Sequence, residues 1–573
     1  MKKINYITIL MVTLMLVFVN ACNQEFLEVN PNGGLDANVL ATETGVDGLL
    51  TGAYAMLDGT SGSFGWEAAA SNWVYGSIRG GEANKGTDGG DQPDINPIMN
   101  YTETASNPYL NVRWRSLYES IARCNEVINV GAVAVAAGAL DDATYALFVG
   151  QARALRGHYH VEAIKLWGNV PYVDEETDPT TVTNTADITD LVLADLAAGL
   201  SLPTNMSQTG RFNKTVVQVL LAKATMQLKG DYTTALGYLN SAKGGTAPDG
   251  SAIGLEDNYG DIFDIEFRNG KEAVYTVQYS VNDGSGGINA GTGEVLNFPY
   301  KGGGSPGGCC GFFQPTQEFV NSFRTNADGL PLLDGSYNND PVLNDQGLAI
   351  DATNYVLDPG NLDPRLDWSV GRRGIPYLDW GPHTGQDWIR DQSYAGPFSP
   401  KKQVYKKAQE GQFTEVGNWT SGYTANGYRM IRYADILLLA AECQAQTGDL
   451  AGALANVNLV RARAANESGW VKNEDGTNAA TYVIGEYTSF SDKATALSAI
   501  LMERKLELGQ EGHRWFDLKR FGVSTTAINS YLTYSKTLGQ TYITSSTSYS
   551  AGNDLFPIPQ RQIDLSNGAL VQN

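Results

Sequence analysis

The chain has 573 residues, with 40 Lys and Arg against 62 Asp and Glu and a formal net charge of −22. Its length exceeds one typical domain of roughly 100–200 residues, and its 42% hydrophobic residues can bury a large core. The acid surplus excludes nucleic acid as a partner, because phosphate binding requires clustered Lys and Arg. Gly-rich loops with many aromatic rings, here 64 Gly, 29 Tyr, 18 Phe and 10 Trp, suit a surface that recognises a flat, polar ligand.

The N-terminus has the pattern of an export signal. Two lysines precede an apolar run at 7–19, which is shorter than the roughly 20 residues needed to span a bilayer. Small residues then lead directly to Cys22, an arrangement that resembles the bacterial lipobox. We therefore predict a lipoprotein signal peptide over residues 1–21, acylation of Cys22, and a chain that is anchored to the membrane without spanning it. The alternative is an ordinary secretory signal followed by a chance cysteine.

Apolar residues at helical spacing dominate the N-terminal part that follows. An amphipathic stripe over about 107–130 predicts one long helix, and a second run continues over about 144–167. Further helices are predicted at about 187–200, 214–229 and 232–243.

The middle of the chain, about 245–428, has a different character. Gly, Pro, Asn and Asp recur every few residues, and only short alternating runs such as 272–279 read as strands. Cys309 and Cys310 are adjacent within a glycine-rich segment, where they can form a vicinal disulfide or remain two free thiols. Cys124 and Cys443 lie in helical patterns and are predicted to be small buried core residues.

The C-terminal part returns to helices at about 429–446, 450–465 and 491–510. An internal repeat links it to the N-terminal part, because an apolar helix ends in Gly230-Asp231 in one copy and in Gly448-Asp449 in the other. Gly suits the left-handed end of a helix and Asp caps the next one. This is the pattern of tetratricopeptide-like helical hairpins, which stack to bury their apolar faces.

Catalytic and metal-binding patterns are weak. GxSxG and GxGxxG are formally matched within 302–307, but the flanking strand and helix that both motifs need are not predicted. His158 and His160 lie two apart on a helix, so they point to different faces and cannot chelate together. We expect no catalytic residue, no metal and no cofactor. Counting carboxylates leaves a pair of the glycosidase type open as an alternative, and a calcium site at 88–94 competes with a solvated loop.

Aromatic residues gather in three loop segments. The first, 66–75, precedes a polar loop at 77–96, the second, 377–390, interleaves rings with Asp379, Asp387 and Arg390, and the third is 312–314. Sugars present apolar C–H faces and hydroxyls, so their sites pair aromatic platforms with Asp, Asn, Arg or Gln. The predicted ligand-binding residues are Trp73, Tyr75, Arg79, Asp91, Gln92, Phe312, Tyr377, Trp380 and Trp388. The alternative is that these rings pack long loops onto the helical body.

Three C-terminal stretches carry a resemblance to a known family. They are 432–442 with Asn458 and 460–463, then 503–508 with 511–520, and finally 555–559 with 572–573. Together with the lipobox, the 363–365 segment and the helical hairpins, they resemble the SusD/RagB family of Bacteroidetes surface lipoproteins. Glu503, Arg504, Arg514 and Asp517 within these stretches are predicted to be structural charges that pair where helices meet.

The resemblance implies a mainly α fold, in which tetratricopeptide-like hairpins form a scaffold and a long loop-rich insertion contains short strands. It implies one SusD-like domain over 22–573, with a helical part at about 35–243, a ligand-facing part at about 245–428 and a second helical part at about 429–573.

The resemblance also implies a non-catalytic protein, lipid-anchored on the outer membrane and exposed at the cell surface. It would bind an oligosaccharide or polysaccharide and pass it to a SusC-like TonB-dependent transporter, with the hairpins facing the transporter. Ligand sites in the family follow no fixed motif, so no binding residue is transferred from it. The alternatives are the same role with peptide cargo, a surface glycosidase, and a purely structural scaffold.

Overall fold

The computed structural model describes residues 37–59, 65–301, 304–417 and 420–573. The predicted signal peptide and Cys22 lie outside these residues. Among the helices that are described, none is long and apolar enough to cross a membrane.

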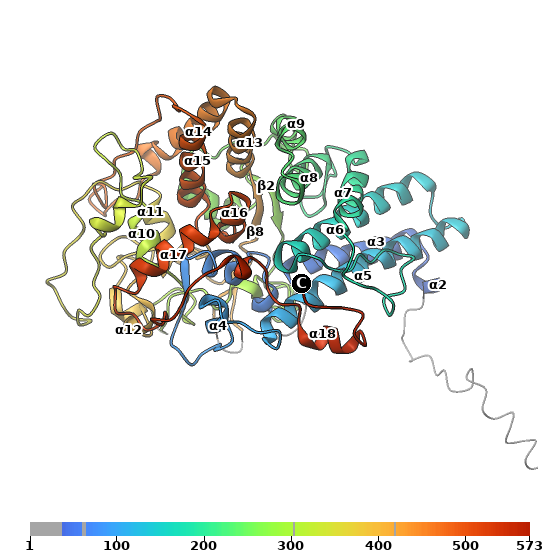
Figure 1. The fold of residues 1–573 in the computed structure, drawn as a ribbon, viewed down its shortest axis with the longest axis horizontal. Coiled ribbons are helices and arrows are strands. Elements are labelled where there is room, and N and C mark those ends of the chain that lie inside the picture. The colour runs from blue at the N-terminus through green and yellow to red at the C-terminus, as the bar shows by residue number, and fades with distance from the viewer. Residues whose placement is uncertain (1–36, 60–64, 302–303, 418–419) are drawn as a thin grey trace, which may run out of the picture.

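Helices form most of the body (Figure 1). The N-terminal group consists of α2 Ala37–Leu40, α3 Glu43–Ala55, α4 Ile95–Met99, α5 Pro108–Ala136, α6 Asp142–Trp167, α7 Thr189–Ala198, α8 Lys214–Lys229 and α9 Tyr232–Lys243. The C-terminal group consists of α13 Tyr433–Thr447, α14 Leu450–Ala464, α15 Lys493–Leu508, α16 Arg514–Arg520, α17 Ser524–Ser535 and α18 Gln560–Leu565. In its described residues the middle adds the short α-helices α10 Gln317–Asn321, α11 Leu366–Ser369 and α12 Gln392–Ala395, together with short 3-10 helices.

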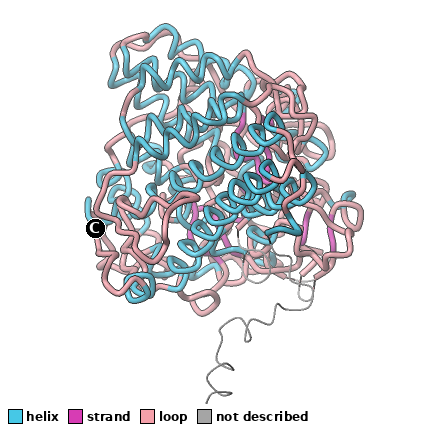
Figure 2. Tube along the Cα trace, turned by 90° about the vertical axis from the view of Figure 1, so that its right-hand side faces the viewer, coloured by secondary structure: helices cyan, strands magenta, loops and turns pink. Residues whose placement is uncertain are grey.

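The long helices pack against one another, mostly as pairs that are close in the sequence. Helix α5 contacts α3 and α6, α6 contacts α7, and α8 contacts α9. Helix α13 contacts α14 and α15 and also α9, so the C-terminal helices continue the N-terminal stack. Figure 2 shows these helices layered through the body with loops at its edges. The predicted mainly α, hairpin-based scaffold is therefore confirmed.

The internal repeat forms two corresponding helical hairpins, α8–α9 and α13–α14. Gly230 and Gly448 end the first helix of each pair at φ +61° and +94°, a region that glycine enters without steric cost. Asp231 and Asp449 then cap the second helix by accepting the backbone N–H of the residue three positions later. The two copies have the same turn chemistry because they have the same Gly-Asp pair.

Strands are short and antiparallel throughout the described residues. They form four two-stranded sheets: β1 Ala83–Gly86 with β3 Phe312–Pro315, β2 Ala273–Val277 with β8 Tyr428–Arg432, β4 Val370–Gly371 with β5 Ser399–Pro400, and β6 Thr414–Glu415 with β7 Tyr423–Thr424. The strand predicted at 272–279 is β2. Its partner β8 leads directly into α13, so this sheet joins the loop-rich middle to the C-terminal helices.

A buried ionic cluster lies where these parts meet, and we call it the Glu507 cluster. Glu507 on α15 lies 2.5 Å from Arg463 of α14, 3.0 Å from Arg432 at the end of β8 and 3.1 Å from Arg365 before α11. Glu272, just before β2, binds Arg432 at 2.6 Å and Arg463 at 2.8 Å. All five side chains are almost completely buried, so each charge depends on the others for compensation.

The other charges predicted to be structural lie beside this cluster. Glu503 binds Arg365 and Arg461, and Arg504 binds Asp517 at 2.8 Å. Arg514 differs, because its guanidinium donates to the carbonyl oxygen of Leu501. Three of the four predicted charges thus form the expected pairs.

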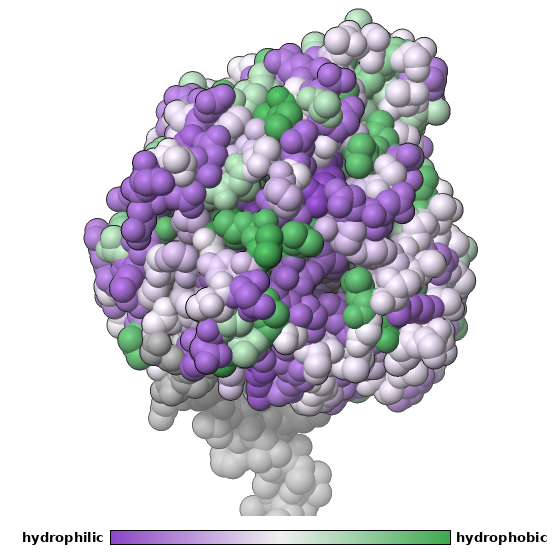
Figure 3. All heavy atoms as spheres, turned by 90° about the vertical axis from the view of Figure 1, so that its left-hand side faces the viewer, coloured by the Kyte–Doolittle hydropathy of each residue, from purple (hydrophilic) through white to green (hydrophobic). Residues whose placement is uncertain are grey.

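Loops and short helices of the middle segment occupy the left-hand side of Figure 1. The face on that side, drawn in Figure 3, is largely hydrophilic with apolar side chains gathered in places. The large apolar residues that segment 341–357 exposes are Leu343, Ile350, Val356 and Leu357.

Replacing Glu507 by Gln is expected to lower the free energy of unfolding by about 3–5 kcal/mol, because it leaves three buried arginines with one carboxylate fewer. Urea denaturation followed by circular dichroism measures this change. Asp190→Asn is the control, since Asp190 pairs with Lys229 at the surface, and it should leave the midpoint unchanged. An equal effect of the two variants would contradict the proposed importance of burial.

Acid should destabilise the fold by protonating buried carboxylates that pair with arginines. Burial raises the pKa of Asp517, but Arg504 and Arg520 outweigh it and lower the pKa to about 2. Because the folded pKa lies below the unfolded value of about 3.9, the stabilisation is present above pH 4 and is lost as pH falls toward 2. Asp517→Asn should therefore show a smaller loss of stability than wild type across this window, as measured by denaturation at each pH.

Candidate ligand-binding surface

Two loop segments that are 300 residues apart in the sequence meet at Arg390. Its guanidinium binds Asp88 at 2.8 Å, Asp91 at 2.7 Å and the Thr87 hydroxyl at 2.8 Å. The two aspartates and Arg390 are each about one-third exposed, so this ion pair network lies at the surface. It joins the polar loop after β1 to the aromatic segment 377–390.

The buried side chain of Lys85 binds the backbone of the same polar loop. Its ammonium is buried and donates to the carbonyl oxygens of Asp88 and Asp91, while it lies 5.6 Å from the Phe312 ring and 5.2 Å from the Tyr394 ring. Burial lowers the pKa of Lys85 to about 8, although the two aspartates act in the opposite direction. The ammonium replaces its lost hydration with two carbonyl groups and two ring faces, which fixes the loop in one conformation.

Asp88 is kept ionised at this surface. Partial burial raises its pKa, but backbone N–H groups of Asp91 and Gly90, together with Arg390, lower it below the ordinary value overall. One Asp88 oxygen accepts from both N–H groups at 2.9 and 2.8 Å. The surface therefore presents fixed carboxylate oxygens beside a guanidinium.

Two half-buried aromatic rings belong to this region, Tyr300 beside Arg390 and Trp380 in the same aromatic segment 377–390. The Arg390 guanidinium lies 5.2 Å from the Tyr300 ring, and the Tyr300 backbone N–H donates to the Trp388 carbonyl at 3.0 Å. Trp380 donates its indole N–H to the Tyr405 carbonyl at 2.9 Å, with Lys407 5.8 Å from its ring. Both rings retain exposed area; the Trp380 ring is oriented by its indole hydrogen bond, and the Tyr300 backbone is held by its own hydrogen bond.

A disulfide between Cys309 and Cys310 lies next to Tyr300. Gly311 follows it and packs so closely on Tyr300 that an added Cβ would lie 2.9 Å from the Tyr300 Cβ. The Gly311 N–H donates to the Phe298 carbonyl at 2.8 Å, and its carbonyl accepts from Thr87 at 2.5 Å. Of the two states that the sequence allowed, the structure has the disulfide, and Cys124 and Cys443 are free and buried as predicted.

The comparisons with known proteins identify the family. The model of the SusD family matches residues 271–573, which is more than half of the chain. The chain belongs to the SusD family. SusD-like protein P38 of Formosa agariphila is 24% identical over 547 residues, covering 91% of this chain and 92% of the relative.

Solved structures share the fold of this SusD-family chain at low sequence identity. Surface glycan-binding protein A from Bacteroides thetaiotaomicron, in complex with laminarihexaose, has a TM-score of 0.65 and 22% identity and covers 93% of this chain and 99% of its own. A SusD superfamily protein from Bacteroides vulgatus has a TM-score of 0.66 and 17% identity, with 93% and 98% coverage. A laminarin-binding SusD-like protein has a TM-score of 0.64 and 20% identity, with 93% and 99% coverage.

Four of the predicted ligand-binding residues of this SusD-family chain are core residues. Trp73 donates to the Gly293 carbonyl, and its ring meets Phe312 edge-on, 6.3 Å away. Tyr75 donates to the Tyr109 carbonyl at 3.0 Å. Arg79 is fully buried, 2.8 Å from Glu103. Because these side chains expose no surface, the prediction that Trp73, Tyr75, Arg79 and Phe312 contact ligand is corrected.

The second aromatic group is divided between core and surface. Tyr377 and Trp388 are buried against each other, 5.5 Å apart, so they too have no free ring face and are corrected. Trp380, Asp91 and Gln92 are half-buried and remain predictions, with Gln92 accepting from Tyr109 at 2.9 Å. The alternative interpretation, that rings pack loops onto the body, holds for most of them.

Tyr300 is the surface residue that the sequence reasoning missed. It lies two residues after Phe298 at the start of a glycine-rich segment, outside the three loop segments in which aromatic residues gather. Arg390 is the sequence signal that points to this position, because it belongs to the second aromatic segment and its guanidinium lies 5.2 Å from the Tyr300 ring.

Replacing Lys85 by Met is expected to loosen the polar loop, because two backbone carbonyls lose their shared donor. Hydrogen–deuterium exchange of peptides covering 86–97 should become several-fold faster, while exchange in α5 stays unchanged. Lys301→Met is the control, since Lys301 is half-exposed and its ion pair within the described residues is with Asp387. Unchanged exchange in 86–97 would show that Lys85 does not hold the loop.

Proposed function

We propose that this chain is a non-catalytic glycan-binding protein of the cell surface. It captures an oligosaccharide or polysaccharide at the surface formed by Tyr300, Trp380, Arg390, Asp88 and Asp91. It then passes the glycan to a SusC-like TonB-dependent transporter in the outer membrane. Family membership and the fold shared with laminarin- and laminarihexaose-binding proteins support this proposal.

The observation that carries the proposal is the pairing of half-exposed rings with fixed polar groups. Tyr300 and Trp380 offer apolar faces on which the C–H face of a sugar ring can stack. Arg390 and the two aspartates offer donors and acceptors at fixed positions for hydroxyl groups. Fixed side chains lose little conformational entropy on binding, which favours a weakly hydrophobic ligand such as a sugar.

The proposal includes the place of the chain on the cell. Residues 1–21 act as a lipoprotein signal peptide, Cys22 carries the lipid, and 22–573 act as a single SusD-like domain at the outer surface. Binding needs no covalent step, so we propose no catalytic residue and no cofactor.

Laminarin is the first ligand to test, because proteins of the same fold include a laminarin-binding SusD-like protein and a glycan-binding protein in complex with laminarihexaose. Isothermal titration of the purified protein against laminarin and a panel of other polysaccharides measures affinity. Tyr300→Ala and Trp380→Ala should each weaken the binding that is found by about tenfold, equivalent to about 1.4 kcal/mol.

Phe267→Ala is the control, since Phe267 is an exposed ring with no described contact to Tyr300, Trp380 or Arg390, and it should bind as wild type. Unchanged affinity in both test variants would show that the glycan binds elsewhere. Binding of a peptide panel with no glycan bound would favour peptide cargo, and release of reducing ends from a bound glycan would favour an enzyme.

A further inference from the structure

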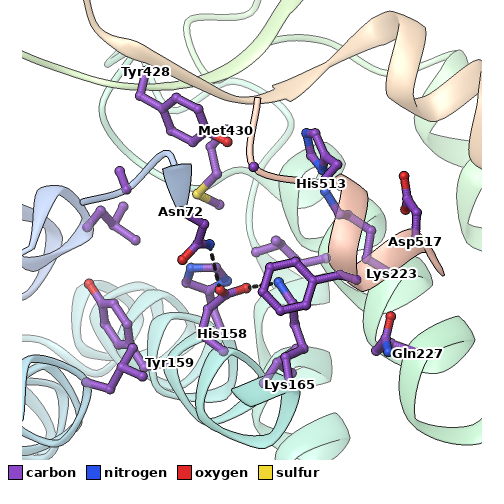
Figure 4. Close-up of a pocket in the computed structure, with 18 of the residues that line it drawn as sticks. Asn72, His158, Tyr159, Lys165, Lys223, Gln227, Tyr428, Met430, His513 and Asp517 are labelled. Carbon is purple, nitrogen blue, oxygen red and sulfur yellow. Dashed lines mark hydrogen bonds and ion pairs between the residues drawn. The ribbon is translucent and has the colours of Figure 1, made fainter. Parts of the chain in front are cut away.

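A central cavity of about 110 Å³ lies between the two helical groups (Figure 4). Helices α5, α6 and α8 line it from the N-terminal side, and α13, α15 and α16 line it from the C-terminal side. It lies in the helical scaffold and shares no lining residue with the surface at Arg390. Its volume is sufficient for a small ion together with water.

Two histidines in the cavity have unused hydrogen-bonding groups. His158 comes from α6 and His513 immediately precedes α16 (Figure 4). Within the described residues, neither imidazole ring has a hydrogen bond, whereas both ring nitrogens of His160 and of His383 do. The side-chain amide of Gln227, from α8, likewise has no partner among the described residues.

The cavity also has a surplus of cationic donors. Lys165 makes one hydrogen bond, to Glu162 at 2.7 Å, and Lys223 makes one, to Asp435 at 3.0 Å. An ammonium has three N–H donors, so two on each lysine have no protein acceptor in the described structure. Arg113, Arg504 and Arg520 add further positive charge.

The carboxylates around the cavity already form ion pairs with arginine or lysine. Asp435 and Asp517 share Arg504, at 2.7 and 2.8 Å. Glu442 binds Arg520 at 2.8 Å, and Glu162 accepts from Lys165 and from Asn72. Five cationic side chains thus lie at or near the cavity, compared with four carboxylates. The carboxylate oxygens already accept hydrogen bonds, so N–H donors outnumber free acceptors.

The electrostatic state of the histidines agrees with this excess. Burial lowers the pKa of His158 to about 4, with Lys165, Arg113 and Lys223 acting in the same direction against Glu162. Burial also lowers the pKa of His513 to about 4, helped by Lys223 and Arg504 and opposed by Asp435 and Asp517. Both rings are therefore neutral at physiological pH, and each provides one N–H donor.

We propose that the central cavity binds one small oxyanion. Lys165 and Lys223 provide charge-assisted hydrogen bonds, and His158, His513 and Gln227 provide neutral donors. Phe516, whose ring lies 3.9 Å from the Lys165 ammonium, and leucines of α5 and α8 close the remaining walls. The ligand would join the N-terminal and C-terminal helices, because its donors come from both groups.

The test uses the four histidines of the purified full chain, labelled with ¹³C in the imidazole ring and observed by NMR. Addition of sodium phosphate at constant ionic strength should shift the signals of His158 and His513 and raise their pKa by roughly one unit or more, because an adjacent anion favours the charged ring. The signals of His160 and His383 serve as internal controls and should not move. Parallel titrations with sulfate and acetate distinguish a tetrahedral oxyanion from a carboxylate.

Variants assign the binding to the cavity. Gln227→Leu removes a donor without changing charge, and Lys223→Met removes one cation; we expect phosphate affinity to fall several-fold and at least tenfold, respectively. Lys243→Met is the matched control, because Lys243 bonds Asn456 outside the cavity, and it should bind as wild type.

If Lys223→Met does not fold, Gln227→Leu and His158→Gln, which preserve the charge, carry the test. The proposal is overturned if no oxyanion moves the His158 and His513 signals, since the cavity then holds only water. It is equally overturned if the folded cavity variants bind phosphate as tightly as wild type.

Discussion

The charge on Glu507 is the constraint around which the molecule is organised. A buried carboxylate is tolerated only when cations and hydrogen bonds replace its hydration, and here three arginines from β8, α14 and the segment before α11 do so. None of these elements can move away without leaving an uncompensated charge. The cluster therefore specifies how the loop-rich middle docks on the helices, which a purely apolar contact would leave less defined.

The Glu507 cluster is connected to the candidate ligand surface through a series of contacts. Arg432 also binds Glu511, and Glu511 binds Lys402 at 2.8 Å. Lys402 lies three residues before Tyr405, whose carbonyl orients the Trp380 indole. A chain of ionic and hydrogen-bonded contacts thus runs from the buried core to an exposed ring, so a loop with little regular structure still presents a fixed ring face.

Local chemistry made the scaffold predictable. The Gly-Asp pairs at 230–231 and 448–449 act within a few residues, as do the periodic apolar positions of α5 and α6, so the sequence alone located these helices. The site was less predictable because exposure depends on distant residues. Trp73 and Trp380 look alike in the sequence, but Phe312 and Phe313 cover Trp73 and no comparable ring covers the outer face of Trp380 among the described contacts. Only the packing distinguishes them.

Arg79 has a consequence for how the protein is made. Its guanidinium lies within 5 Å of the Trp515 and Phe556 rings and donates to the Asn553 carbonyl at 2.7 Å. These partners lie more than 430 residues later in the sequence, so the N-terminal segment cannot reach its final burial until almost the whole chain is available. Long-range closure of this kind slows folding and leaves intermediates with exposed apolar surface. A chain closed in this way completes the burial of its N-terminal helices only after its synthesis has ended.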